Sequence, residues 1–415
     1  MKVEQLCAAS RDASRVLSTL PRARKDEALI AVAEALDRRS AEILTENAED
    51  VRLARDDRLP DAMIDRLLLD GDRLKEASAS VRALAAFPDP VGQVVAGWRL
   101  ENGLELRQVR APLGVVAVVY EARPNVTVDA ACLCLKTGNA VILRGGSAAK
   151  HTNRILTEVV QGAVMGARLP REVVAYLSPD RRELTELIKQ RRYVDLVVPR
   201  GGEQLKDFLL EHSRVPVVHA AGGNCHVYVD AAADLDKAVP IIINAKCQRP
   251  GVCNAAETLL VHEAVAAAFL PRAVEELKRR GVELVVDEVT AGVLDDPSLQ
   301  RATESDYATE FLALKLAVRV VASIDEALDH VARYGTRHSE AIVTDDLTVA
   351  NRFTTEVDAA CVYVNASTRF TDGGCFGLGG EMGVSTQKLH VRGPIALDDL
   401  TCVKYVLWGD GQVRE

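Results

Sequence analysis

The sequence predicts an α/β protein with two doubly wound parallel sheets and a small separate group of β-strands. From Pro112 onward, short continuous apolar runs alternate with stretches of helical apolar spacing. Such runs are typical of strands buried on both faces, as in parallel sheets. A second series of the same kind follows Asp230, and only helical spacing precedes Phe87. Alternating strands and helices indicate a doubly wound sheet of the nucleotide-binding kind.

Composition places the chain among ordinary enzymes. It has 415 residues, enough for two or three domains, with 27% charged and 4% aromatic residues and a net charge of −9. There is no dense Lys/Arg run, which disfavours a nucleic-acid or anionic-membrane partner. The amino terminus lacks the apolar core of a signal peptide, and no segment approaches 18 continuous apolar residues. We therefore expect a cytoplasmic protein.

Residues 2–87 are predicted to form consecutive helices, because apolar residues recur with helical spacing and β-branched runs are absent. After FPDP, the segments QVVAGWRL and LELRQVRA flank Glu101, Asn102 and Gly103, a hairpin pattern. A bare two-stranded ribbon is marginal by itself, so it is expected to pack on something, such as another subunit. The late segment TCVKYVLWG is a candidate third strand of this ribbon.

The predicted strands of the two parallel sheets are short apolar runs. In the first series they are GVVAVVY, NAVILRGG, VVAYLS, VDLVVPRGG, VPVVHAAGG and HVYVD. In the second they are ETLLVH, VELVV, LAVRVV and EAIVT. Helices are expected between them.

The first candidate cofactor site follows the strand NAVILRGG. This strand ends at Arg144, and Gly145, Gly146 and Ser147 lead into a helix that starts with His151. A glycine-rich turn into a helix suits a phosphate, because free backbone N–H groups and the helix dipole favour an anion. An arginine, with no carboxylate at the strand tip, favours the 2′-phosphate of NADP over NAD.

A second such turn is PRGGEQL, in which Gly201 and Gly202 follow a strand and precede a helix. Each turn alone is a weak signal, and two turns on neighbouring strands of one sheet strengthen it. The segment GLGGEMG does not have the spacing of the dinucleotide-binding fingerprint.

The nine cysteines do not indicate a disulfide framework or a zinc site, because their number is odd and no CxxC pair occurs. Most are expected to be reduced thiols in the core. Cys253, in QRPGVCNAAE, is the candidate nucleophile. A Pro-Gly bend and small neighbours would let a substrate approach, and Lys246 and Arg249 are nearby cations that a reactive thiol needs. The alternative is a small buried apolar residue.

Taken together and in this order, several segments closely resemble the aldehyde dehydrogenase superfamily over nearly the whole chain. They are PLGVVAVVYEARPNVTVDAA, LKTGNAVILRGGSAA, QRPGVCNAAETLLV, ALDHVARYGTRHSEAI, VYVNASTRFTDGG and STQKLHVRGP. The resemblance implies an aldehyde dehydrogenase-like fold with a cofactor domain, a catalytic domain and oligomerisation strands. It also implies roles for individual residues: Cys253 as catalytic thiol, Asn125 as oxyanion donor, Arg144 at the adenosine ribose, Glu310 at the nicotinamide ribose, and Gly201 and Gly202 at the pyrophosphate.

One position departs from the superfamily. Ala220 stands where the oxidising enzymes carry a glutamate that activates water to hydrolyse the thioester. A reductase must keep its thioester until hydride arrives, so the missing base favours reduction of an activated acyl group. It does not distinguish an acyl phosphate from an acyl-CoA.

Within the superfamily, the resemblance is to the branch that reduces L-glutamyl 5-phosphate with NADPH in proline biosynthesis. It implies the cofactor NADP(H), a homo-oligomer, and channelling from glutamate 5-kinase. The substrate carries two anionic groups and an ammonium, so it requires fixed cations and an acceptor. The candidates are Arg123, Arg249, Arg369, Asp372 and His390.

The expected domains follow from these assignments. Residues 1–92 and 111–229 form the NADP-binding domain, and 230–365 form the catalytic domain. Residues 93–110 and 396–409 are oligomerisation strands, and 366–395 are active-site and interdomain loops. The alternatives are an oxidising aldehyde dehydrogenase, an acyl-CoA reductase, and a non-catalytic scaffold or a subunit that only assembles with the kinase.

Overall fold

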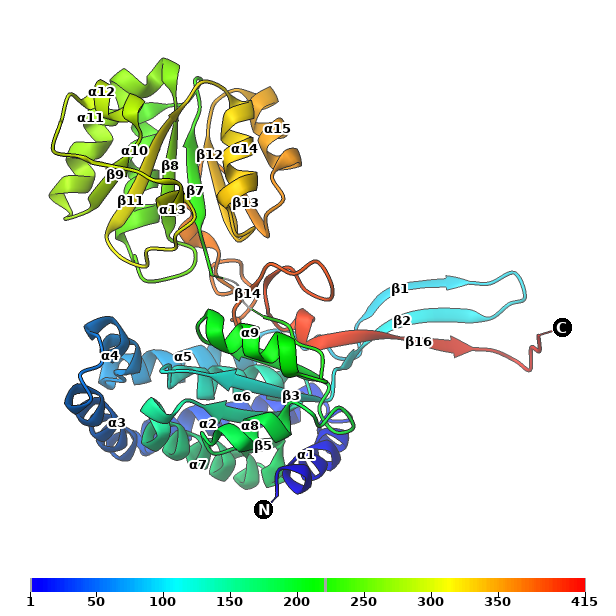
Figure 1. Ribbon diagram of the computed structural model, residues 1–415. Coiled ribbons are helices and arrows are strands. Elements are labelled where there is room, and N and C mark those ends of the chain that lie inside the picture. The colour runs from blue at the N-terminus through cyan, green and yellow to red at the C-terminus, as the bar shows by residue number, and fades with distance from the viewer. Residues whose placement is uncertain (1, 220–221, 415) are drawn as a thin grey trace. The chain divides into compact units, whose positions relative to one another are not determined.

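The computed structural model describes residues 2–219 and 222–414, and it divides the chain into two compact units (Figure 1). The first unit comprises residues 1–219, 377–383 and 395–415, and the second comprises 220–376 and 384–394. The predicted boundary at 229/230 is therefore ten residues late. The cause is the strand Cys225–Val229, which was expected in the first sheet but pairs with strands of the second unit.

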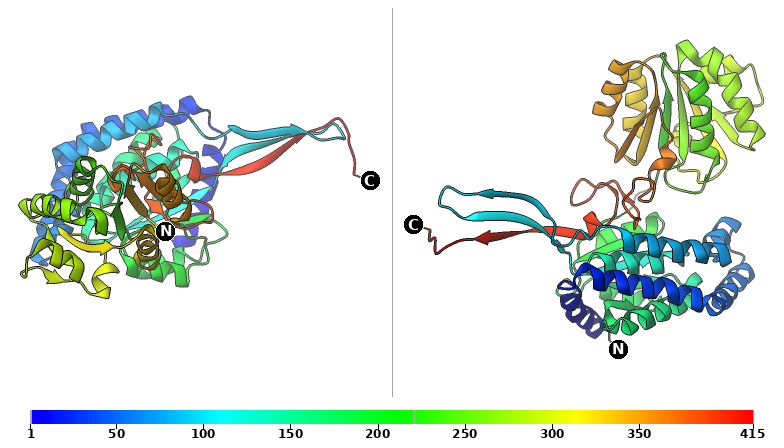
Figure 2. Two further views of the ribbon diagram at one scale, coloured as in Figure 1. Left: turned by 90° about the horizontal axis from the view of Figure 1, so that it is seen from above. Right: turned by 180° about the vertical axis from the view of Figure 1, so that it is seen from behind.

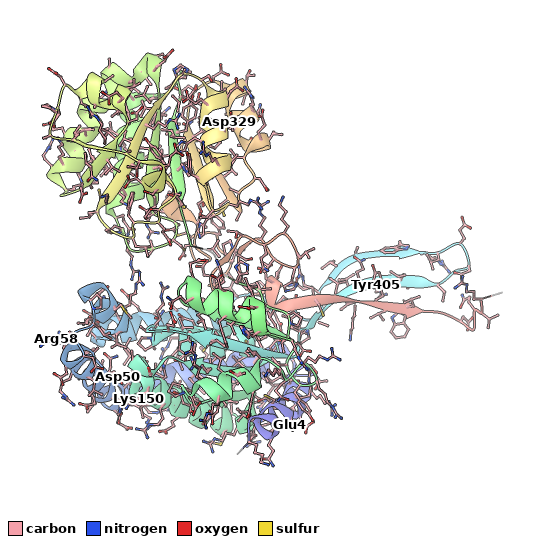
Figure 3. All side chains as sticks on the ribbon, in the orientation of Figure 1. Glu4, Asp50, Arg58, Lys150, Asp329 and Tyr405 are labelled. Carbon is pink, nitrogen blue, oxygen red and sulfur yellow. The ribbon has the colours of Figure 1, made fainter. Side chains whose placement is uncertain are left out.

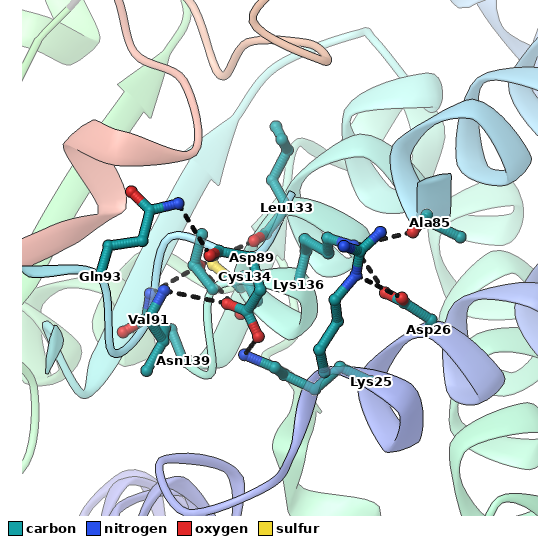
Figure 4. A network of polar contacts seen from close by, with 12 residues as sticks. Lys25, Asp26, Ala85, Asp89, Val91, Gln93, Leu133, Cys134, Lys136 and Asn139 are labelled. Atoms are coloured by element: carbon teal, nitrogen blue, oxygen red, sulfur yellow. Dashed lines mark hydrogen bonds and ion pairs between the residues drawn. The ribbon is translucent and has the colours of Figure 1, made fainter. Parts of the chain in front are cut away.

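The first unit begins with the predicted run of helices. They are α1 (Val3–Leu17), α2 (Arg22–Arg38), α3 (Ser40–Asp56), α4 (Asp61–Leu67) and α5 (Gly71–Ala86). Two buried lysines bind carboxylates in this part of the unit (Figure 4). Lys25 pairs with Asp89 at 2.5 Å, and Lys136 pairs with Asp26 at 2.6 Å. Burial of a charge is tolerated when the charge is paired in this way.

A four-stranded parallel sheet forms the core of the first unit, in the order β5-β4-β3-β6. Its strands are β3 (Val115–Tyr120), β4 (Ala140–Gly145), β5 (Val174–Tyr176) and β6 (Leu196–Arg200). Its helices are α6 (Asn125–Lys136), α7 (Lys150–Gly166), α8 (Arg181–Leu187) and α9 (Glu203–His212). All six residues of β3 are buried, which confirms the prediction from continuous apolar runs. Among the described residues of the segment VPVVHAAGG, Val217 forms a single bridge to Val197.

The predicted hairpin and its third strand are confirmed. Strands β1 (Val94–Arg99), β2 (Glu105–Pro112) and β16 (Thr401–Trp408) form an antiparallel sheet in the order β1-β2-β16. The three strands extend away from the helices of their unit (Figure 2). Every residue of β1 is exposed. This sheet, which we call the ribbon, therefore has no core of its own.

The second unit contains a seven-stranded parallel sheet in the order β10-β9-β11-β8-β7-β12-β13. Its strands are β7 (Cys225–Val229), β8 (Ala256–His262), β9 (Glu283–Val286), β10 (Gln300–Arg301), β11 (Lys315–Val321), β12 (Ser339–Val343) and β13 (Cys361–Val364). A two-stranded pair, β14 (Val384–Ser385) and β15 (Gly393–Pro394), also belongs to this unit. The predicted second β/α series is confirmed, and β10 and β13 are additions to it.

Helices cover both faces of this sheet. They are α10 (Leu235–Cys247), α11 (Glu263–Arg279), α12 (Glu288–Leu294), α13 (Glu304–Tyr307), α14 (Ile324–Tyr334) and α15 (Leu347–Glu356). Two separate apolar clusters show which helices share a face: α10, α11 and α12 contribute to one, and α14 and α15 to the other. Alternate residues of one strand enter different clusters, Val227 the first and Tyr228 the second. This is the doubly wound arrangement that the sequence predicts.

The helices are short relative to a bilayer. Several of the longest, such as α2 and α11, have 17 residues, which corresponds to about 25 Å against the roughly 30 Å of a hydrocarbon core. In the part of the chain that the structure describes, no helix is long and apolar enough to cross a membrane.

Candidate active site

The predicted nucleophile lies in a short connection between α10 and β8, residues 248–255, which we call the cysteine loop. Cys253 is half-buried in this loop, whereas five of the other eight cysteines are fully buried. The loop precedes β8, so it lies at the amino end of that strand, beside the amino end of its neighbour β7. A half-buried thiol can be reached by a substrate and still be held by its surroundings, as a reactive cysteine requires.

Arg369 and its neighbours hold the cysteine loop from one side. The Arg369 guanidinium donates from Nε to Oε1 of Gln248 at 2.8 Å and from Nη1 to Oδ1 of Asn254. The Asn254 amide donates to the carbonyl of Thr371 at 2.8 Å. The hydroxyl of Thr368 donates to the carbonyl of Asn254 at 2.7 Å. The residue that directly follows Cys253 is therefore fixed through both its side chain and its backbone.

The same contacts bring positive charge to the loop. Burial lowers the pKa of Arg369, the charge of Arg249 lowers it further, and the thiol of Cys253 acts in the opposite direction. Arg369 therefore interacts electrostatically with both Arg249 and Cys253. The role of Arg249 at the thiol stays a prediction. Lys246 does not have the predicted role, because it is fully buried and pairs with Glu257 at 2.5 Å. A cationic surrounding is what a nucleophilic thiolate needs.

The other side of the loop packs against the segment that precedes β7. A Cβ atom on Gly223 would lie 1.4 Å from the carbonyl oxygen of Cys253, so only glycine fits there. The Cys225 thiol donates to the same carbonyl at 3.2 Å. Oε1 of Glu310 accepts the N–H of Gly223 at 2.7 Å. Glu310 is predicted to bind the nicotinamide ribose. Its carboxylate is thus hydrogen-bonded to Gly223, the residue that lies against Cys253.

A chain of hydroxyl groups lies beneath the loop. Nδ1 of His338 is 2.8 Å from Oγ of Ser339, which is 2.7 Å from Oγ1 of Thr371, and that oxygen is 2.7 Å from the Tyr363 hydroxyl. Because Thr371 also holds Asn254, this buried network supports the loop directly. Single residues of these common types carry no signal in the sequence, so sequence reasoning missed Thr371 and Tyr363.

The two glycine-rich turns of the first unit lie at one edge of its sheet. Gly145 aligns with Tyr120, and Tyr120 aligns with Arg200, so the carboxyl ends of β4, β3 and β6 coincide. The two turns were expected on neighbouring strands. They instead follow β4 and β6, which lie on either side of β3. A Cβ on Gly145 would lie 2.0 Å from Nδ2 of Asn153, so this glycine is required by packing. An edge of this kind is where open α/β sheets bind ligands.

Glu121, directly after β3, occupies part of this edge. Its Oε2 accepts the N–H of Gly202 at 2.9 Å, and a Cβ on Gly201 would lie 2.6 Å from the same oxygen. The N–H that the pyrophosphate is expected to use therefore already binds an anion. Glycine at both positions places no side chain beside that N–H, which suits a phosphate in place of the carboxylate.

The amino terminus of α7 is occupied by another carboxylate. Asp50 accepts the N–H groups of His151 and Thr152 at 3.2 and 2.8 Å, and Figure 3 shows it near Lys150. This end of the helix is therefore not open to a phosphate, contrary to expectation. The predicted turn retains Gly146, Ser147 and half-buried Arg144, whose Nη2 donates to the Pro179 carbonyl at 2.5 Å.

Asn125 and Arg123 also belong to the first unit. Asn125 begins α6, one residue position after Pro124, and its Nδ2 donates to Oδ2 of Asp129 at 3.1 Å. Burial raises the pKa of Asp129 to about 6, and the bond from Asn125 opposes this shift. Arg123 is half-buried just before the helix. The amide of Asn125 is thus oriented along its own helix by the carboxylate one turn later.

The remaining predicted residues lie in or near loops. Asp372 is exposed and accepts the N–H groups of Gly374 and Cys375 at 2.8 and 3.0 Å, which makes it a turn residue. His390 is exposed and has a left-handed backbone with φ of 68°. Ala220 lies outside the described residues.

Comparison with known proteins identifies the family. The aldehyde dehydrogenase family model matches residues 1–301. The gamma-glutamyl phosphate reductases of Thermobifida fusca and Moorella thermoacetica are each 52% identical, over 99% and 98% of this chain and 98% and 97% of their own. The crystal structure of gamma-glutamyl phosphate reductase from Thermotoga maritima is 45% identical, with a TM-score of 0.96 and full coverage of both chains. The chain therefore belongs to the aldehyde dehydrogenase family, with its nicotinamide cofactor, and within it to the gamma-glutamyl phosphate reductases.

Proposed function

We propose that the chain reduces L-glutamyl 5-phosphate to L-glutamate 5-semialdehyde and phosphate, with NADPH, as the second step of proline biosynthesis. The chain is 52% identical over nearly its full length to two gamma-glutamyl phosphate reductases, which supports this choice of substrate. The observation that carries the mechanism is the cysteine loop, because it holds a half-buried thiol with fixed backbone on both sides and arginines beside it.

In the first chemical step, the Cys253 thiolate attacks the γ-carbonyl carbon of the substrate. A C–S bond forms, the C–O bond to phosphate breaks, and phosphate leaves with the bonding electron pair. The backbone N–H of Cys253 and the amide of Asn125 are the proposed donors to the oxyanion. Donors fixed in advance are effective, because they need no reorganisation when the charge develops. The contacts of Gly223 and Asn254 keep the backbone of Cys253 in place.

The residues at the edge of the first sheet would hold the cofactor. Gly201 and Gly202 would bind the pyrophosphate, with Glu121 displaced from the N–H of Gly202, and Gly145, Gly146, Ser147 and Arg144 would surround the adenosine end. The guanidinium of Arg144 favours a 2′-phosphate, which supports NADP over NAD. When bound, the reduced nicotinamide would supply a hydride to the thioester carbon. The C–S bond then breaks, which releases the aldehyde and returns the Cys253 thiolate. Glu310 is the proposed partner of the nicotinamide ribose.

One feature of the sequence supports reduction of the thioester over its hydrolysis, and a second feature supports a cationic substrate pocket. Ala220 offers no carboxylate to activate water. Arg369 and Arg249 lie at the cysteine loop and suit the phosphate or the α-carboxylate of the substrate. Arg123, Asp372 and His390 remain weaker candidates for the rest of the ligand. If the substrate KM of Arg369→Ala equals that of the wild type, Arg369 has no role in binding.

The ribbon supports assembly into a homo-oligomer. Exposed apolar side chains occur on its strands, including Trp98, Val403, Tyr405, Leu407 and Trp408. A thin sheet with no core of its own needs a covering surface, and a patch of this kind marks an interface. We assign a second copy of the chain as the partner. Delivery of the labile acyl phosphate by glutamate 5-kinase and a cytoplasmic location are also part of the proposal.

The reverse reaction tests this function. Purified protein is mixed with glutamate 5-semialdehyde, NADP⁺ and phosphate, and each is omitted in turn while reduced cofactor is followed by its absorbance. We expect a rise only in the complete mixture. Coenzyme A in place of phosphate distinguishes an acyl-CoA reductase, and a rise without either distinguishes an oxidising aldehyde dehydrogenase. No rise in the complete mixture contradicts the proposal.

Cys253→Ala gives the corresponding test of the nucleophile. Turnover should be abolished, while NADPH still binds and quenches protein fluorescence. Cys402→Ala is the matched control, since it removes an exposed thiol of the ribbon. A near-normal rate for Cys253→Ala removes that residue from the mechanism.

A further inference from the structure

We propose that Lys246 and Glu257 are a positioning pair that fixes the cysteine loop, and with it the backbone N–H and thiol of Cys253, for acyl transfer. This inference rests on the proposed function, because it concerns the same nucleophile. Neither residue is assigned a contact with substrate or cofactor. They act on the reaction only through the backbone that carries Cys253.

The pair joins the two ends of the loop. Lys246 lies in the last turn of α10, and Glu257 is the second residue of β8. Nζ of Lys246 is 2.5 Å from Oε2 of Glu257, and both side chains are fully buried. A buried ion pair is costly to desolvate and is weak evidence for stability, so its presence calls for another reason. Closing the loop that carries the nucleophile is such a reason.

The second oxygen of Glu257 extends the connection to another segment. Oε1 accepts the N–H of Leu312 at 3.1 Å. Leu312 has φ of 53°, in the left-handed region that a leucine rarely adopts. A strained residue of this kind persists only where its surroundings fix it, and strain of this kind often lies at functional sites.

From Leu312 the connection returns to Cys253. Glu310, two residues earlier, accepts the N–H of Gly223 at 2.7 Å. Gly223 lies directly against the Cys253 carbonyl. The ring of contacts therefore runs from Glu257 through Leu312, Glu310 and Gly223 to the nucleophile. Burial raises the pKa of Glu257 to about 7 and lowers that of Lys246, and the contact between the two side chains opposes both shifts.

Two double variants test the pair without leaving a charge unpaired. Lys246→Met/Glu257→Gln removes both charges and keeps a side-chain oxygen for the Leu312 N–H. Lys246→Met/Glu257→Leu removes the charges and that oxygen. Apolar replacement of a buried ion pair is often neutral for stability, so both variants are expected to fold. Lys136→Met is the matched control, because it removes an equally buried lysine of the first unit (Figure 4).

The measurements are kcat, the KM for NADPH, and the rate at which iodoacetamide alkylates Cys253, followed by mass spectrometry of its peptide. We expect the glutamine double variant to keep kcat within about tenfold. In the leucine double variant, kcat should fall by about a hundredfold or more, because a misplacement of roughly 1 Å has that effect. Alkylation should change with kcat, and the KM for NADPH should stay within about twofold. Lys136→Met should lose stability but keep kcat.

Wild-type kcat values and wild-type alkylation rates in both double variants would overturn the proposal. If the leucine variant does not fold, Glu257→Asp decides, because it keeps the charge but withdraws the carboxylate from Leu312. A wild-type kcat in that variant rejects the positioning role. A different result would show that the proposed function is wrong, namely an active Cys253→Ala enzyme. In that case the alkylation rates of the double variants would still show whether the pair fixes the loop.

Discussion

Gly223 and Cys253 are in such close backbone contact that a single added methyl group at position 223 would overlap the carbonyl oxygen of the cysteine, at 1.4 Å. The contact joins the segment before β7 to the connection before β8, which are adjacent in the sheet. Gly223 also donates its N–H to the carboxylate of Glu310. The position of the predicted nucleophile is therefore set by a glycine about thirty residues away in sequence.

Gly223→Ala should lower kcat by about a hundredfold or more, because the Cys253 backbone must shift to accommodate the methyl group. Steady-state kinetics with a thermal melt measures this. Gly292→Ala is the matched control: it lies in α12, and a Cβ there meets no atom within 4 Å. That variant should keep full activity and gain about 0.5 kcal/mol of stability from helix propensity. A Gly223→Ala enzyme with wild-type kcat would show that the contact is not required.

Arg144→Ala should raise the KM for NADPH by about tenfold to a hundredfold, since a hydrogen bond to a charged group contributes roughly 1.5–3 kcal/mol. The KM for NADH should change by less than about threefold, because that cofactor lacks the 2′-phosphate. Initial rates with both cofactors give the ratio. Equal effects on NADPH and NADH would contradict the assigned role of Arg144.

Glu121→Gln should tighten the binding of NADPH several-fold. The carboxylate now accepts the N–H of Gly202 at 2.9 Å, at the predicted pyrophosphate turn. Glutamine keeps an oxygen for that bond and removes the negative charge that repels the phosphates. Fluorescence titration at low and high salt measures the dissociation constant of NADPH. The gain in affinity should shrink at high salt, because salt screens the charge. Weaker binding by the variant would mean that Glu121 assists the cofactor.

His330→Phe should flatten the dependence of stability on pH. Burial lowers the pKa of His330 from 6.5 to about 2, and the charges of His226 and Arg319 contribute. Nη1 of Arg319 donates to its Nδ1 at 3.4 Å, as a neutral ring requires. Because the folded pKa lies below the unfolded one, stability is fully present above pH 6.5 and is lost as the pH falls toward 2.

The wild type should therefore lose about 2 kcal/mol more than His330→Phe between pH 7 and pH 5, at about 1.4 kcal/mol per pH unit below 6.5. Denaturant unfolding at the two pH values measures the difference. Parallel stability curves for the two proteins would contradict it.

A Val403→Glu/Leu407→Glu variant should reduce the oligomer to a smaller species. Both side chains are about half exposed, at 44% and 52%, and they alternate along one face of β16 with Tyr405, which Figure 3 shows on the ribbon. Charges there would oppose burial against a second copy. Light scattering after size-exclusion chromatography gives the mass. Lys404→Glu, on the opposite face, is the control, and an unchanged mass for the double variant would reject this face as the interface.

Much of the fold follows from local pattern. Helical spacing before Phe87, the turn at Asn102 and Gly103, and continuous apolar runs each predicted the observed element, because these signals depend on residues close in sequence. The segment HVYVD was placed in the wrong sheet for the same reason. A continuous apolar run predicts a buried parallel strand. It does not identify the strands that pair with it, because those lie far away in the sequence.

The candidate site divides in the same way. Sequence alone indicated the glycine turns, because they depend on residue type within a short motif. The resemblance of the sequence to the superfamily gave Cys253 as the candidate nucleophile and Ala220 in place of the water-activating base. Tertiary structure alone decided that Lys246 pairs with Glu257, that Asp50 occupies the start of α7, and that Gly223, Asn254 and Thr371 hold the cysteine loop. These contacts join residues from 11 to 117 positions apart. Only a folded chain brings such groups within hydrogen-bonding distance, so no local pattern records them.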